Sequence, residues 1–286
     1  MKHYWLIVWI CLLGLPTVSG QMLWKVEGKE RQTPSYLFGT IHLGHPQAYT
    51  FSDQALKALA ATDGMAGELV FDPAAIFKVM SKVMMKDSTL RDLLPPEKYA
   101  LVHEKITERL GMIAPMAERM QPAFVSVLLM EQEEGTTADL GEAPQRTPLD
   151  LYLQEQARKQ NKDVRGLETV EEQMDAFASM SLKMQAEALY EAVQANEKSS
   201  GQLQQMLDLY EKGELDTLYQ LAIREMPPQT AERFLDQRNQ RMTERMMDML
   251  KEKSWFVAVG AAHLPGEQGM IALLRKAGYT VIPISD

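Results

Sequence analysis

The sequence predicts an α/β fold, with a mixed central sheet formed from both chain ends and a large helical insertion between them. Strand-like apolar segments gather near both ends, at residues 23–70 and 255–284. Capped, amphipathic segments typical of helices fill about residues 73–250. The chain has 286 residues, of which 45% are hydrophobic and 24% charged, so it is long enough for one large domain carrying such an insertion.

The expected strands differ in how strongly the sequence supports them. Trp255 to Val259 form a continuous apolar run typical of a buried strand. The first two strands flank a polar stretch and suggest a hairpin. A short strand is also expected inside the helical insertion, after a charged helix end. In all, strands are expected at residues 23–26, 36–41, 65–70, 164–167, 255–259 and 279–284.

Helix boundaries are marked by residues with known capping preferences. Thr169 and Glu172 form a capping box at the start of a helix. Gly213 separates two shorter helices, and Gly278 ends the last one. Most of the 20 methionines lie in the insertion, where they favour adaptable packing between helices, with a soft-metal or partner surface as the alternative. Helices are expected at residues 52–61, 228–251 and 266–277, among others.

The first 20 residues resemble a secretory signal peptide. Met1, Lys2 and His3 form a short positive start, and an apolar run at residues 4–13 is too short to span a bilayer. Small residues precede a cleavage position near Gly20; an uncleaved signal anchor is the alternative. The only cysteine lies inside this segment. We therefore expect a periplasmic or secreted protein without disulfides and without a membrane anchor after cleavage.

The charge balance argues against a nucleic-acid partner. The formal net charge is −9, and no basic block interrupts the acidic chain. The sequence also contains no Gly-x-Ser-x-Gly elbow, no His-Glu-x-x-His motif and no phosphate-binding loop. A serine hydrolase and a nucleotide-hydrolysing enzyme are therefore not supported, and we expect a peptide or small-molecule substrate.

Two histidines occupy matching sequence contexts. His42 and His263 each follow a predicted strand in the pattern Gly-x-x-His-Leu, with Gly39 and Gly260 as the glycines. The pattern favours a shared site, although two unrelated histidines in separate strand-end turns would give the same spacing. His45 is close enough to the first motif to support it, whereas His103 lies on a charged helix and is expected to be solvated.

Two glutamates are predicted near the same edge of the sheet. Glu68 comes at the end of the third strand, and Glu168 directly precedes the Thr169 cap. Ligands bind beside the carboxyl ends of strands in open α/β sheets, and histidine with carboxylate suits a divalent metal ion or metal-free acid–base catalysis. Glu168 has an alternative explanation, because a carboxylate ahead of a helix N-terminus is favoured by the helix dipole.

Arg238 interrupts an apolar stripe formed by Leu235, Met242, Met246 and Met249 on its predicted helix. A guanidinium on a buried face needs an anionic partner. That partner is either a structural acid or a group of the substrate.

Taken together, these segments make the sequence resemble the TraB/GumN family, which is related to animal TIKI proteases and more distantly to erythromycin esterases and haem-binding ChaN-like proteins. The resemblance covers nearly the whole chain after the signal peptide. It rests on residues 23–26, 36–44, 166–173, 238–239 and 256–269. It implies paired Gly-x-x-His motifs and glutamates that assemble a metal-dependent hydrolytic site.

The resulting hypothesis is an exported hydrolase that cleaves a peptide or ester bond with a metal-activated water. His42, Glu68 and His263 would hold a divalent ion (Mn, Co or Zn), as the resemblance implies. Glu168 would act as general base or fourth ligand, and Arg238 would bind a substrate carboxylate or an oxyanion. The alternative is a non-catalytic periplasmic binder of a metal, haem or peptide. A third class is an assembly factor whose site is vestigial.

Overall fold

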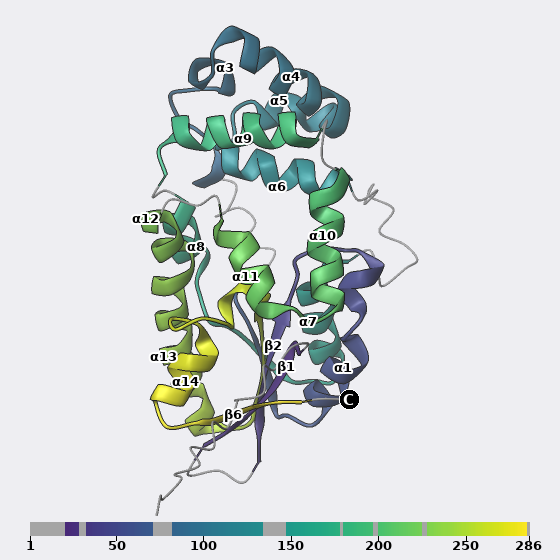
Figure 1. Ribbon diagram of the computed structural model, residues 1–286, viewed down its shortest axis with the longest axis vertical. Helices are drawn as coiled ribbons and strands as arrows, with labels where there is room; N and C mark the ends of the chain where they lie inside the picture. The colour runs from purple at the N-terminus through teal and green to yellow at the C-terminus, as the bar shows by residue number, and fades with distance from the viewer. Residues whose placement is uncertain are drawn as a thin grey trace, which may run out of the picture.

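The computed structural model describes residues 21–28, 33–70, 82–133, 147–177, 180–196, 200–224 and 228–284. The predicted signal peptide lies outside these ranges. Within them the chain forms a mixed six-stranded sheet with helices, which confirms the predicted α/β class. Figure 1 shows the sheet with its flanking helices in the lower half of the molecule and a group of helices above it.

The sheet has the strand order β4-β3-β5-β2-β1-β6. β1 runs antiparallel to β2 and β6, whereas β2, β5, β3 and β4 are parallel to one another. The carboxyl ends of four adjacent strands therefore meet at one edge. The bounds are β1 Leu23–Glu27, β2 Ser35–Thr40, β3 Gly64–Gly67, β4 Asp163–Gly166, β5 Trp255–Gly260 and β6 Thr280–Pro283.

β5 lies in the middle of the sheet and is buried along its whole length, as its continuous apolar run predicts. The hairpin of β1 and β2 is also confirmed, with Leu23 opposite Phe38. β3 is shorter than expected: its pairing with both neighbours stops at Gly67. Glu68 is therefore the first residue of the loop after the strand.

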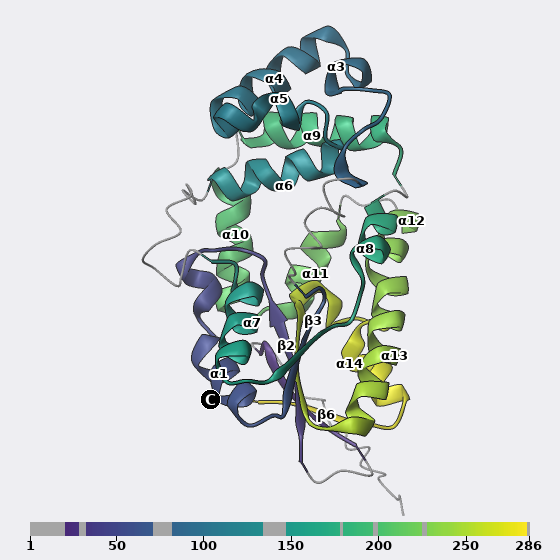
Figure 2. The same ribbon diagram turned by 180° about the vertical axis from the view of Figure 1, so that it is seen from behind.

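Helices from distant parts of the chain cover the sheet (Figures 1 and 2). They share one large core with it, which includes Phe38, Leu59, Leu153, Tyr210 and Phe256. The Met242 and Met246 side chains are fully buried in this core, so packing explains the methionine stripe of α13. These helices are α1 Ser52–Ala60, α7 Leu149–Lys159, α10 Ser200–Glu211, α11 Leu215–Ile223, α13 Gln237–Glu252 and α14 Met270–Lys276. Two further helices, α8 Val170–Phe177 and α12 Pro228–Ala231, contact the segment just before α13.

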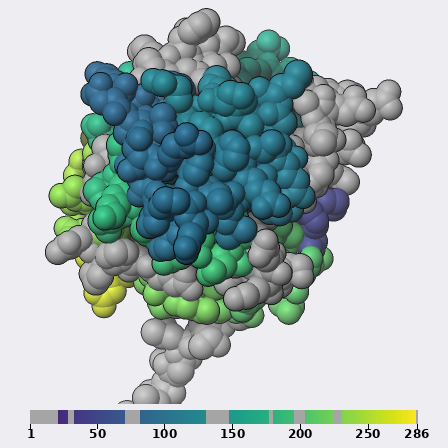
Figure 3. All heavy atoms as spheres, turned by 90° about the horizontal axis from the view of Figure 1, so that it is seen from above, coloured from purple at the N-terminus to yellow at the C-terminus, as the bar shows by residue number. Residues whose placement is uncertain are grey.

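The remaining long helices form a cap with its own hydrophobic core. α4, α6 and α9 pack together around buried residues such as Val102, Ile106, Val125 and Leu189. Seen from above, the cap occupies the centre of the molecule's face (Figure 3). Its helices are α3 Leu90–Leu93, α4 Pro96–Leu110, α5 Ala114–Ala117, α6 Pro122–Glu133 and α9 Leu182–Asn196.

Two helix predictions are corrected by the structure. The last helix begins at Met270 and not at Gly266, because Gly266 adopts a left-handed turn with φ +85°. The helix expected over residues 228–251 is interrupted by a π-helical segment, Glu232–Asp236. Among the described residues, no helix is both long and apolar enough to cross a membrane.

Candidate active site

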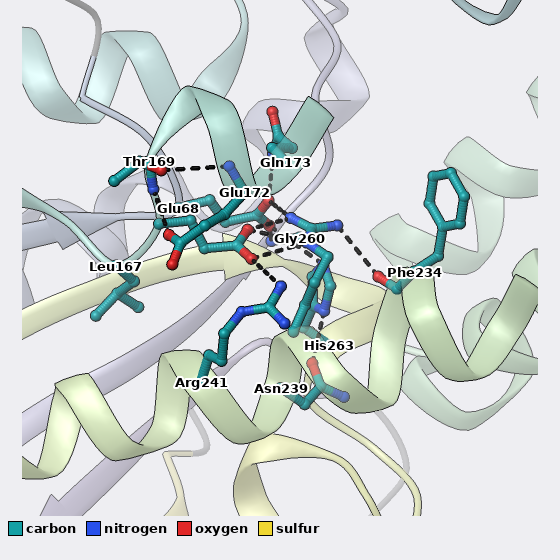
Figure 4. Close-up of polar contacts among 12 residues, drawn as sticks. Glu68, Leu167, Thr169, Glu172, Gln173, Phe234, Asn239, Arg241, Gly260 and His263 are labelled. Carbon is teal, nitrogen blue, oxygen red and sulfur yellow. Dashed lines mark hydrogen bonds and ion pairs between the residues drawn. The ribbon is translucent and has the colours of Figure 1, made fainter. Parts of the chain in front are cut away.

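The strand order brings together three of the residues singled out in the sequence. His42 follows β2, Glu68 follows β3 and His263 follows β5, and β5 pairs with both of the other strands in parallel. All three residues therefore lie at the same carboxyl edge of the sheet. Figure 4 shows Glu68 and His263 converging near Gly260.

Glu68 is the centre of this group. Its Oε1 lies 3.7 Å from His42 Nε2 and 3.6 Å from His263 Nε2. The same oxygen accepts a hydrogen bond of 2.6 Å from the backbone N–H of Gly260. Both histidines thus present the same ring nitrogen to one carboxylate oxygen.

Gly260 leaves a small hollow between these groups. A Cβ atom at this position would lie 3.2 Å from Glu68 Oε1, 3.2 Å from His42 Nε2 and 3.5 Å from the His263 ring. Any side chain at residue 260 would therefore fill the space that the three functional groups share. Gly260, the glycine of the second Gly-x-x-His motif, therefore keeps this space free of a side chain.

His263 is buried and held by α13. Its Nδ1 lies 2.6 Å from Asn239 Oδ1, and Asn239 Nδ2 donates to the backbone carbonyl of Gln268 at 2.9 Å. Because the second bond fixes the amide orientation, His263 Nδ1 must be the protonated nitrogen, and Nε2 keeps its lone pair. Burial lowers the pKa of His263 to about 4, so the ring is neutral at neutral pH.

His42 is far more open, with 54% of its side chain exposed, and it faces acids on both sides. Its Nδ1 lies 3.4 Å from Asp150 Oδ2, on the first turn of α7. Although partial desolvation of the ring opposes protonation, the carboxylates of Asp150 and Glu68 raise the pKa of His42 well above 6.5.

Arg238 holds the other oxygen of Glu68. Its Nη2 donates 2.7 Å hydrogen bonds to Glu68 Oε2 and to Glu168 Oε2, and its Nε donates to both oxygens of Glu168. Burial alone would raise the pKa of Glu68, but the positive charges of His42 and Arg238 lower it well below its usual value. Glu68 is therefore a carboxylate with a fixed orientation.

The π-helical segment before α13 contributes to this arrangement. Arg238 Nη1 donates to the backbone carbonyl of Phe234, inside that segment, at 3.2 Å. A π-helical turn shifts the regular hydrogen-bond pattern, and such turns are frequent at functional sites. The local distortion thus gives the buried guanidinium an additional acceptor.

The structure shows where the other predicted residues lie. The Glu168 side chain is fully buried, with Arg238 as its main partner and Arg241 3.5 Å away. The catalytic roles of Glu168 and Arg238 stay predictions, since their contacts are with each other and with Glu68. His45 caps a short 3-10 helix through Nδ1, at 3.3 Å from the Gln47 N–H. His103 lies in the cap, 2.7 Å from Glu118.

The sequence does not mark Asp150 as a site residue, and it does not predict that Asn239 is a partner of His263. An acid after Pro148 at a helix start has an ordinary explanation in the helix dipole, so it carries no distinct signal. Asn239 lies next to Arg238 in the interrupted stripe, which could have indicated a second inward-facing polar group. Both residues are recognisable only once the strand order is known.

The donor set and the hollow fit a divalent ion. Two imidazoles and one carboxylate are ligands that catalytic zinc sites use, and ligands of one ion with bonds of about 2.1 Å lie roughly 3.4 Å apart when tetrahedral. The separations of 3.6 and 3.7 Å are close to that value. Within the described ranges, however, no three His, Cys, Asp or Glu side chains already stand together as a metal-holding group. Binding therefore requires these side chains to turn towards one ion.

Fold and site together define a class: an α/β protein in which two Gly-x-x-His turns and a strand-end glutamate meet at the centre of a mixed sheet. The family model described as TraB/PrgY/gumN matches residues 22–283. The chain belongs to this family, which confirms the resemblance seen in the sequence.

Curated relatives carry the name metalloprotease. The chain is 26% identical to Metalloprotease TIKI2 of Xenopus tropicalis, over 94% of this chain and 61% of that protein. It is 25% identical to Metalloprotease TIKI1 of Danio rerio (91% and 62%) and 26% identical to the Homo sapiens TIKI1 (91% and 61%). The chain thus spans about three fifths of the length of these relatives. No solved structure matches.

Proposed function

We propose that this protein is an exported metal-dependent hydrolase that cleaves a peptide or ester bond. The observation that carries the proposal is the hollow at Gly260, where Glu68 Oε1 faces the Nε2 atoms of both histidines. The relatives named metalloproteases support the same chemistry. His42, Glu68 and His263 would hold the ion.

A divalent ion bound there would act as a Lewis acid and lower the pKa of water towards neutrality. The chain's own residues prepare the place for it. His263 is neutral and keeps its Nε2 lone pair because Nδ1–H donates to Asn239. Glu68 supplies a negative charge whose direction Arg238 fixes.

We assign Glu168 a supporting role. Its fully buried side chain makes it unsuited to reach a substrate, whereas its bidentate contact with Arg238 fixes the guanidinium that holds Glu68. Arg238 has few donors left for a substrate oxygen. A substrate would enter over His42, since His42 is the exposed member and Glu68 and His263 are buried.

The signal-like first 20 residues support export, to the periplasm or outside the cell. The protein recovered from the cell envelope should begin near Gln21 and be released by osmotic shock. Envelope protein that retains Met1 and stays with the membranes would contradict this part of the proposal.

Metal analysis and peptidase assays on the purified protein test the chemistry. Zn, Mn or Co should raise the melting temperature, since a ligand bound only to the native state adds about 2.7 kcal/mol at 100 times its Kd. His263→Ala should abolish that increase and the hydrolysis of peptides. His103→Ala is the matched control, because His103 lies in the cap.

The outcomes separate the functional classes. Metal binding with peptide turnover supports the hydrolase. Metal binding without turnover of any peptide or ester favours the non-catalytic binder. An equal metal response in the wild type and in the His42→Ala, His263→Ala double variant would rule out the site.

A further inference from the structure

We propose that Asp150 is a positioning residue for His42. Its carboxylate accepts the Nδ1–H of the ring and thereby directs Nε2 towards the hollow at Gly260. This inference rests on the proposed metal site and adds to it a residue that lies outside the Gly-x-x-His motifs.

The contacts place a carboxylate at each nitrogen of the His42 ring. Asp150 Oδ2 lies 3.4 Å from Nδ1, and Glu68 Oε1 lies 3.7 Å from Nε2. In a neutral imidazole, an Nδ1–H that donates to an acid leaves the lone pair on Nε2, the form that a metal ion requires once it has displaced any Nε2 proton. Asp150 thus selects the tautomer that the site needs.

Asp150 does not behave as a structural acid. Its Oδ1 is buried and has no hydrogen-bond partner among the described residues. A buried carboxylate oxygen without a partner costs free energy. Glu168 provides the contrast, because both of its oxygens accept hydrogen bonds from Arg238. The one described polar partner of Asp150 within ion-pair distance is His42.

The backbone of α7 is fixed on both sides of Asp150. Before it, Tyr49 Oη donates to the carbonyl of Thr147 at 2.6 Å. After it, Gln154 Nε2 donates to the carbonyl of Leu69 at 2.9 Å. Leu69 directly follows Glu68, so α7 is attached to the loop that carries the central carboxylate. Asp150 can therefore orient His42 relative to Glu68.

Both histidines thus direct Nδ1 towards an acceptor on a neighbouring helix, but the two acceptors differ in charge. His263 donates its Nδ1–H to a neutral amide in the protein interior. His42 is half exposed and has a charged acceptor, Asp150, at the longer distance of 3.4 Å.

The first test is zinc affinity, measured by competition with a chelating dye on the full protein. Asp150→Ala should weaken zinc binding about 10–100-fold, the usual effect of losing a partner of a metal ligand. Asp150→Asn, which keeps an acceptor without the charge, should lose less. Asp53→Asn should bind like the wild type, because Asp53 also lies in the first turn of a helix but is exposed on α1. Urea unfolding of the metal-free variants reports any structural damage.

The second readout is the proton spectrum of the cobalt-loaded protein. The wild type should show two shifted, exchangeable ring N–H resonances, one for each histidine. Asp150→Ala should lose the His42 resonance to solvent exchange and keep that of His263, which Asn239→Ala identifies. If the wild type binds zinc and Asp150→Ala keeps the same affinity and both resonances, that result would overturn the role of Asp150 but leave the proposed metal site standing. A wild type that binds no zinc would overturn the metal site and this inference with it.

Discussion

His42 and His263 share a four-residue motif, yet their surroundings are opposite. His263 is 5% exposed, faces an amide on α13 and has a pKa lowered to about 4. His42 is half exposed and has a raised pKa. It faces Asp150 on α7 and Glu68 in the loop after β3. The comparison teaches that the motif sets the place of each ring at the sheet edge, whereas the element facing the ring sets its protonation and mobility.

The glycines of the two motifs differ in the same way. A Cβ at Gly39 would meet Leu264 Cδ1 at 3.0 Å and the backbone of Ala261 at 3.2 Å. Gly39 therefore allows the turn after β5 to pack against β2. A Cβ at Gly260 would instead meet the polar atoms of the site. One glycine supports packing, and the other leaves open the space between Glu68, His42 and His263.

Removing the guanidinium of Arg238, which holds the buried Glu68, should have the largest effect on stability. Arg238→Met leaves Glu68 and Glu168 buried without their shared partner, so we expect a loss of about 3–5 kcal/mol in the free energy of unfolding. Urea denaturation measures it. The control is Arg241→Met, which removes a partly exposed partner 3.5 Å from Glu168 and should cost about 1 kcal/mol or less. Equal losses would show that Arg238 does not hold the acids.

Exchanging the two glycines for alanine should separate packing from ligand binding. Gly39→Ala should destabilise the protein by about 1–3 kcal/mol, because its backbone neighbour cannot easily move, and change zinc affinity little. Gly260→Ala should weaken zinc binding on the order of 100-fold with a smaller loss of stability. Thermal unfolding and dye competition measure the two effects. If both variants lose stability and affinity in the same ratio, the division between the glycines is wrong.

Removing the amide beside His263 should have an intermediate effect. Asn239→Ala leaves the buried Nδ1–H of His263 and the Gln268 carbonyl without their partner, which should cost about 1–2 kcal/mol of stability. The matched variant on the exposed side, Asp150→Ala, should cost less, because water reaches the His42 ring. Chemical denaturation of the two metal-free variants provides the comparison. A larger loss in Asp150→Ala would contradict the contrast between the buried His263 and the exposed His42.

The smallest effect on stability is expected for Glu172, in the first turn of α8. Arg245 and the Thr169 backbone N–H lower the pKa of Glu172 from 4.5 to about 2. A lowered pKa means that Glu172 stabilises the fold above pH 4.5 and that this contribution is lost as the pH falls towards 2. Because the pair is partly exposed, Glu172→Gln should cost only about 0.5–1 kcal/mol at pH 7.

The difference between the wild type and Glu172→Gln should disappear near pH 2. Urea titrations at several pH values measure this convergence. A difference in stability that does not change with pH would mean that packing, and not the charge, is responsible.

The sequence predicts the parts of this site that depend on local patterns. The strand ends before His42 and His263 follow from apolar runs ended by glycine, and the capping box at Thr169 follows from its spacing. The interruption of the methionine stripe correctly indicates a buried Arg238.

What the sequence does not predict depends on contacts between distant segments. Arg238 pairs with acids that follow β3 and β4, and only the strand order brings those acids together. Asp150 resembles any acid at a helix start until α7 is placed beside His42. The late start of α14 follows from the turn at Gly266, whose conformation the helical pattern does not encode.

The position of β5 has a consequence for the order in which the molecule forms. β5 lies between β3 and β2 and comes from near the end of the chain. Until β5 has been made, β2 and β3, the strands that His42 and Glu68 follow, have no strand between them to join them. Sheets built from sequence-distant segments fold slowly, whereas helical groups with local contacts, such as α4 and α6, fold fast. The cap is therefore expected to form first, and the sheet edge that carries His42, Glu68 and His263 is completed only after β5 arrives.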